Sequence, residues 1–190
     1  MAYTTLSQAG IDFSKTYAVA TAVTATSGLD VPSPPWAVGT MELGSLGSEW
    51  VFCIAGGTIA AGDFVVLTTP SSFTVAAVTN TNGLAGFGSW VGVAGGAVTV
   101  GQFLWVQRSG YASSANVATS ATAFAALHTT TTAGRLNSSG TANTTATVSG
   151  VVGTATAASN TAPVVMSRSI IGVLDYGNRG GFGRPLTPLR

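Results

Sequence analysis

The residues that could carry out covalent or metal chemistry are few and scattered. His128 is the single histidine and Cys53 the single cysteine of the 190-residue chain. A catalytic triad or a zinc cluster would therefore depend on one imidazole or one thiol. The chain has no Gly-x-Ser-x-Gly nucleophile motif. The six acidic residues would permit a carboxylate pair for glycoside hydrolysis, but nothing in their spacing singles one out. We therefore expect no enzyme activity, no metal and no cofactor.

Charge is scarce and unevenly placed. The chain has seven basic and six acidic residues, for a net charge of +1. Residues 1–107 contain Lys15 as their one basic residue, whereas residues 108–190 contain Asp175 as their one acidic residue. Opposite charge in the two halves would suit contacts between neighbouring subunits. A surface with so little charge is weakly protected from association, which predicts that a partner or an oligomer covers it.

Two classes of partner are not expected. No basic run with interleaved aromatic residues is present, so the sequence does not favour nucleic-acid binding. No window offers about 18 uninterrupted apolar residues, and the N-terminus does not resemble a secretory signal, so we expect no membrane association. The chain is therefore expected to be made and assembled in a host cytoplasm.

The elements that must position these residues are strands. Short apolar runs rich in β-branched and aromatic residues alternate with Gly, Asn and Ser clusters, a pattern typical of strands and turns. The runs lie at Trp50–Ile54, Phe64–Thr68, Phe73–Val78, Trp90–Val93, Phe103–Arg108, Val148–Thr154 and Val164–Val173. Ala121–Leu127 comes closest to a helix, but its threonine-rich flanks favour β geometry. The Thr/Ser-rich tract 129–150 is either a long loop or a flat, polar-faced sheet.

A twelve-residue pattern occurs twice. Residues 55–66 and 94–105 match in every glycine and in the phenylalanine, at an offset of 39 residues. Each copy predicts a Gly-Gly turn, a short strand, a second glycine turn and an apolar strand, with the glycines supplying positive φ. We interpret the copies as two similar corners of one all-β domain, a single compact β-sandwich or β-barrel.

The two ends of the chain differ from its middle. Residues 1–35 end in a proline-rich stretch and are predicted to form an extended N-terminal arm. Residues 36–176 are predicted to form the β-domain, and the Gly/Pro/Arg-rich residues 177–190 are predicted to form a C-terminal arm. Trp is enriched at binding hot spots, and Trp36 directly follows the N-terminal arm. The candidate interface residues lie in or next to the arms: Tyr17, Val19, Trp36, Arg179, Phe182 and Arg184.

Four segments combine glycines and turns in a recognisable way: residues 47–52, residues 92–112, residues 126–136 and residues 148–155. Together they resemble tailed-bacteriophage head structural proteins, over roughly residues 38–174. The resemblance implies a capsid decoration, or cement, protein: a small β-domain, often a homotrimer, that binds the major capsid protein on the outer surface of the virion. Such a protein stabilises the shell against internal pressure. A tail, fibre or receptor-binding component of the virion is the alternative.

Overall fold

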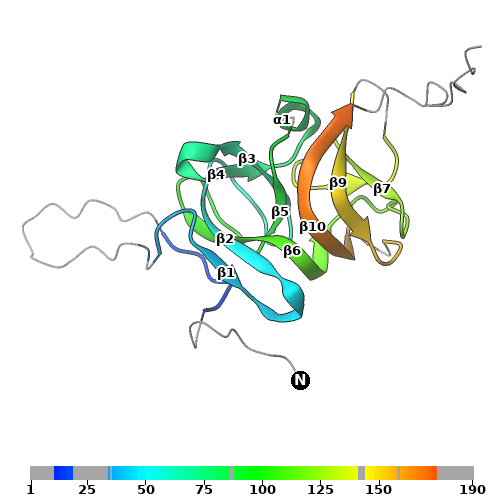
Figure 1. Ribbon diagram of the computed structural model, residues 1–190. Coiled ribbons are helices and arrows are strands. Elements are labelled where there is room, and N and C mark those ends of the chain that lie inside the picture. The colour runs from blue at the N-terminus through cyan, green and yellow to red at the C-terminus, as the bar shows by residue number, and fades with distance from the viewer. Residues whose placement is uncertain are drawn as a thin grey trace, which may run out of the picture.

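The fold is all-β, as the strand pattern predicts (Figure 1). The computed structural model describes residues 11–18, 34, 36–85, 88–140, 144–157 and 159–174. These residues form ten strands, one short α-helix, α1 (Asn80–Ala85), and two 3₁₀ helices of three residues each, at Ser45–Gly47 and Pro70–Ser72. The strands are β1 (Met41–Leu43), β2 (Glu49–Ala55), β3 (Phe64–Thr69), β4 (Thr74–Ala77), β5 (Val91–Ala94), β6 (Phe103–Asn116), β7 (Ala126–Thr129), β8 (Leu136–Asn137), β9 (Ala146–Gly153) and β10 (Thr161–Leu174).

All seven predicted strands are present, and three short strands and the helix were not predicted. β1, β7 and β8 span only two to four residues each. Helix α1 begins with a reciprocal cap, because the Thr79 N–H donates to Asn82 Oδ1 at 2.6 Å and the Asn82 N–H donates to Thr79 Oγ1 at 3.3 Å. The stretch 121–127 is not a helix, because it turns at Phe124 and then enters β7.

Five of the strands close into a barrel. β2 pairs with β4 in parallel, and β4–β3, β3–β5 and β5–β6 are antiparallel pairs. The antiparallel pairing of β6 with β2, which joins Phe103 to Ile54, completes the ring. The 14-residue β6 then leaves the barrel, and its second half pairs with β10. β10, β9, β7 and β8 follow in that order as an outer sheet. Figure 1 shows β10, β9 and β7 beside the barrel.

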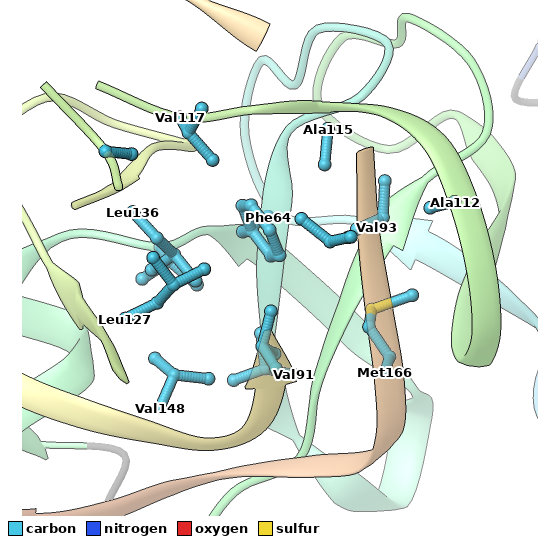
Figure 2. Close-up of a cluster of buried hydrophobic side chains, with 14 of the residues drawn as sticks. Phe64, Val91, Val93, Ala112, Ala115, Val117, Leu127, Leu136, Val148 and Met166 are labelled. Atoms are coloured by element: carbon cyan, nitrogen blue, oxygen red, sulfur yellow. The ribbon is translucent and has the colours of Figure 1, made fainter. Parts of the chain in front are cut away.

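Two apolar cores lie on opposite sides of the barrel wall. The first fills the barrel with side chains from all five of its strands, including Val51, Val65 and Leu104. The second lies between the barrel and the outer sheet and contains Phe64 and Leu127 (Figure 2). Successive residues of a strand point to opposite faces, so a strand between two cores is apolar throughout. Residues 64–67 are accordingly buried at every position.

The repeated pattern forms a pseudo-twofold pair. Ile59 and Val98 are equivalent positions of the two copies, and each donates its N–H to the other's carbonyl at 2.9 Å. The Gly62 N–H donates to the Ala94 carbonyl, and the equivalent Gly101 N–H donates to the Ala55 carbonyl, at 2.9 and 2.7 Å. The copies are thus not merely similar corners, because they interlock with each other.

The glycines of the repeat have two different roles. Gly62 and Gly101 have φ of +81° and +80°, which confirms the predicted positive φ at the second turn. The same expectation for the Gly-Gly pairs is wrong, because neither pair (residues 56–57 and 95–96) has positive φ. At residues 95–96 glycine is instead required by the close approach of another segment, residues 11–18.

Candidate interaction surface

The two most reactive side chains, the Cys53 thiol and the His128 imidazole, lie inside the fold. The Cys53 side chain on β2 is fully buried in the barrel, and burial raises the pKa of its thiol to about 12. His128 on β7 is 9% exposed, and its Nδ1 lies 3.3 Å from the Thr147 hydroxyl. Within the described ranges, no three His, Cys, Asp or Glu side chains are grouped so that they could hold a metal ion. None of the helices in that same part of the chain is long and apolar enough to cross a membrane.

An apolar stripe crosses the outward face of the outer sheet. Tyr111 on β6 faces Val165 on β10, and Val165 faces Val152 on β9. These side chains are 41%, 44% and 40% exposed. The exposed Ala126 on β7 continues the row opposite Val152, and Phe124 lies two residues before it. Side chains directly opposite each other on one face touch, so Tyr111, Val165, Val152 and Ala126 form a continuous row. Phe124 lies at the end of this row, where its N–H donates to the Gly153 carbonyl. We call these five residues the outer stripe.

Phe124 is the most unusual residue of the outer stripe. Its side chain is 77% exposed, and its φ is +58°, in the left-handed region that disfavours a residue with a Cβ. Its N–H donates to the Gly153 carbonyl at 2.9 Å, which holds the turn in place. A glycine would adopt this conformation without strain. A large apolar side chain in a strained and solvent-facing position is a feature typical of binding sites.

The strand segments next to the outer stripe contain no charged residue, and Arg108 and Arg168 directly flank them in the sequence. The strand segments that form this face, residues 109–116, 124–129, 146–153 and 161–167, contain no Asp, Glu, Lys or Arg. Their outward positions are occupied by Ser, Thr, Asn, His, Gly and Pro where they are not apolar. The centres of protein interfaces are likewise depleted of charge and enriched in Tyr and Phe.

A second exposed apolar surface lies on the hairpin formed by β1 and β2. Met41 and Leu43 are each 66% exposed on β1, and Leu46 at the tip is 75% exposed with φ of +56°. Among the described strands, β1 pairs with β2 alone and is an edge of the sheet. Exposed edge strands are surfaces on which further strands can add.

A charged hollow of about 260 Å³ lies between this hairpin and β10. Arg168 makes two hydrogen bonds to Glu49, from Nε at 3.1 Å and from an Nη at 2.7 Å. The Arg168 guanidinium therefore holds the pKa of Glu49 below its ordinary value. Because Glu49 belongs to the acidic half of the sequence and Arg168 to the basic half, this ion pair neutralises part of the charge asymmetry within one chain. Arg108 also lines the hollow, and its guanidinium lies 5.1 Å from the centre of the Trp90 ring.

The predicted interface residues Tyr17 and Trp36 come together in an aromatic cluster. Their rings meet edge to face with centroids 5.5 Å apart, and Trp36 lies 5.2 Å from Trp105. Phe13 stacks on Trp50 at 4.7 Å. Tyr17 and Trp36 are both half-buried by these contacts within the chain. The other four predicted interface residues, Val19, Arg179, Phe182 and Arg184, lie outside the described residues.

Residues 11–18, within the range predicted to be an arm, pack against the barrel. Tyr17 and Phe103 exchange two main-chain hydrogen bonds, of 2.9 and 2.8 Å. The segment thereby covers the outer faces of β2 and β6, where Phe52 and Trp105 are fully buried. The aromatic cluster is therefore a third apolar layer of the domain.

The sequence pattern alone does not reveal the outer stripe. Val165 stands between the buried Val164 and Met166 in one apolar run, so the pattern does not reveal which residue faces outward. The usable signal was Phe124, an aromatic residue in an Ala/Thr stretch that lacks the other marks of a core strand.

No protein-family model matches this chain, and a search of curated proteins found no match. What the protein binds must therefore be inferred from its own surfaces.

Proposed function

We propose that this chain is a virion structural protein of the capsid decoration, or cement, type. In this role it binds the outer surface of the major capsid lattice and stabilises the lattice against internal pressure. It acts by binding, without catalysis, as a homo-oligomer, with a trimer favoured, and it is assembled in the host cytoplasm. The observation that carries the proposal is the uncharged outer stripe with its strained and exposed Phe124.

The outer stripe supports a stabilising role through repeated contacts. Full burial of one Phe side chain contributes about 1.5–3 kcal/mol, and Phe124 is 77% exposed before any partner covers it. Tyr111, Val152 and Val165 each have a further 40–44% of their surface to bury. A shell presents many identical sites, so a modest contact per copy adds up to a large stabilisation when oligomers engage several subunits together.

A tail, fibre or receptor-binding component of the virion is the second candidate. The observation that favours it is the second apolar surface on the β1–β2 hairpin, where Met41, Leu43 and Leu46 are exposed. A protein with two separate apolar surfaces suits a stacked structure, in which each subunit contacts neighbours on two sides.

Phe124→Gly tests the proposal, with Leu46→Gly as the matched control. Both residues are exposed and have a backbone in the left-handed region, so replacement by glycine relieves backbone strain at each and removes one apolar side chain. Particles are to be stripped of the chain by mild heating and then incubated with purified variants, and the bound protein is measured by sedimentation. We expect wild type and Leu46→Gly to rebind, and Phe124→Gly to bind at least about tenfold more weakly.

Undiminished rebinding by Phe124→Gly would count against the outer stripe as the contact surface. Electron microscopy of particles carrying the labelled chain separates the two candidates. Label on the outer surface of the head supports the decoration role, whereas label confined to the tail supports the alternative.

A further inference from the structure

The pseudo-twofold repeat contains two equivalent positions that are covered in different ways. Phe64 and Phe103 begin the apolar strands of the two copies, and each donates its N–H to a carbonyl from elsewhere in the chain. Phe64 donates to Gly134 at 2.9 Å, and Gly134 belongs to the loop between β7 and β8. Phe103 donates to Tyr17 at 2.8 Å. One position is thus covered by a loop between two strands of the outer sheet, and the other by residues 11–18, which precede all the strands in the sequence.

The surface beneath residues 11–18 is shaped to receive them. A Cβ at Gly95 would overlap the Phe13 carbonyl oxygen, and a Cβ at Gly96 would overlap the Ser14 carbonyl oxygen. Gly57 of the first copy is equivalent to Gly96, and a Cβ at Gly57 would meet only open space. We call the surface formed by Gly95, Gly96, Trp50, Phe103 and Trp105 the N-terminal slot.

The contacts in the slot do not depend on which chain supplies the segment. Phe13 stacks on Trp50 and meets Trp105 edge to face at 5.3 Å, and Tyr17 pairs with Phe103 by main-chain hydrogen bonds. Sixteen residue steps separate Ala18 from Pro34, a length of chain that spans at most roughly 55 Å. A covalent connection of this length permits residues 11–18 to reach their own slot or that of a neighbouring copy, and the contacts are the same in either case.

We propose that residues 11–18 are exchanged between copies, so that the N-terminal slot of one subunit holds this segment of a second copy of the chain. Exchange of an identical element needs no new complementary surface, and head-to-tail exchange closes into a ring when the rotation permits. The net charge of +1 opposes the approach of copies only weakly. In an assembly, neighbouring copies also raise the local concentration of the competing segment. The inference does not depend on which structure the oligomer binds.

Photo-crosslinking of the full chain tests the exchange. Phe13→p-benzoylphenylalanine places the crosslinker against Trp50, because the native rings lie 4.7 Å apart. Natural-abundance and ¹⁵N-labelled chains are refolded together in equal amounts, concentrated and irradiated, and the peptides linked to the segment around Trp50 are identified by mass spectrometry. With exchange, about half of these linked peptides should join one labelled chain to one unlabelled chain, as random pairing requires.

A matched pair of glycine variants provides the control. Gly96→Ala should expel the segment, whereas Gly57→Ala at the equivalent open position should not. Mixed-isotope links and the oligomer mass by light scattering should therefore persist in Gly57→Ala and be lost in Gly96→Ala. Phe13→Ala, which removes the ring stack without adding atoms, should also reduce the oligomer mass. Links to Trp50 that stay within one chain at every concentration would overturn the proposal. The absence of links to Trp50, or mixed-isotope links that persist in Gly96→Ala, would do the same.

Discussion

Gly134 joins the outer sheet to the barrel, and its replacement by alanine should be severely destabilising. Its N–H donates to the Val78 carbonyl at 2.8 Å, and its own carbonyl accepts the Phe64 N–H at 2.9 Å. The backbone at this residue is therefore held on both sides. Its φ is +74°, and a Cβ would overlap the carboxyl carbon of Asp63.

The expected loss in the free energy of unfolding can be worked out from two contributions. The left-handed conformation costs an alanine about 1–2 kcal/mol. Displacement of the Asp63 carboxylate, which is 8% exposed, breaks its hydrogen bonds from the Ala60 N–H at 2.8 Å and from Asn116 Nδ2 at 2.7 Å. Hydrogen bonds to a charged group are worth about 1.5–3 kcal/mol each, and partial relaxation retains some of this. We expect Gly134→Ala to cost about 3–6 kcal/mol.

Gly47→Ala isolates the conformational contribution. Gly47 has a similar φ of +70°, but its Cβ would meet nothing within 4 Å, so we expect a loss of only about 1–2 kcal/mol. Urea unfolding, followed by tryptophan fluorescence, gives both values. In a double-mutant cycle with Asp63→Ala, the effect of Gly134→Ala should shrink by at least about 1 kcal/mol, because the displaced carboxylate is already absent. Equal losses for Gly134→Ala and Gly47→Ala would mean that displacement of the Asp63 carboxylate costs no stability.

Three further predictions concern single side chains. Burial raises the pKa of the Cys53 thiol to about 12, so an aromatic disulfide reagent should label it in urea and not in native buffer. Glu49→Gln should lower the urea midpoint at pH 7, because Arg168 lowers the pKa of Glu49 below its ordinary 4.5 in the folded protein. This contribution is complete above that ordinary value and is lost as the pH falls through the lowered pKa, so a difference between wild type and variant that does not change with pH would contradict it. Phe124→Gly should keep or raise the urea midpoint, because glycine adopts a φ of +58° without strain. A fall in the free energy of unfolding of more than about 1 kcal/mol would show instead that the ring stabilises the fold.

The fold class could be predicted because strand signals are local. The run Trp50–Ile54 and the run Phe64–Thr68 consist of β-branched and aromatic residues between glycine and polar clusters, and both are strands. Closure of the barrel could not be predicted, because it depends on the pairing of β2 with β6, two strands far apart in the sequence. Local periodicity sets which face of a strand is apolar but does not specify its partner. The sequence therefore does not distinguish a barrel from a sandwich, and the pairing of β2 with β6 decides between them.

The candidate site was only partly predictable, for a related reason. Tyr17 and Trp36 were chosen for their residue types and positions, and their rings do meet. Residues 11–18 can cover Trp105 because Gly95 and Gly96 have no side chains in their way. These two glycines admit the backbone of residues 13 and 14 and do not supply a turn with positive φ. A sequence pattern does not distinguish these two uses of glycine. The ring contacts of Tyr17 and Trp36 lie within one chain and do not test a role in binding a partner, so the interface predictions for all six residues, Tyr17 and Trp36 included, remain predictions.

The mutual pairing of Ile59 and Val98 also bears on how the chain reaches its native state. Neither copy of the repeat can complete its hydrogen bonds until the other has been synthesised and brought to it, so neither half is a folding unit. Contacts between residues distant in sequence require the intervening loop to close, which costs entropy before the contacts contribute any favourable free energy. Domains dominated by such contacts fold in milliseconds to seconds rather than microseconds. During that interval a chain with seven basic and six acidic residues has little charge repulsion to keep exposed strands apart. Rapid capture by other copies or by a growing assembly would shorten the time for which such strands are exposed.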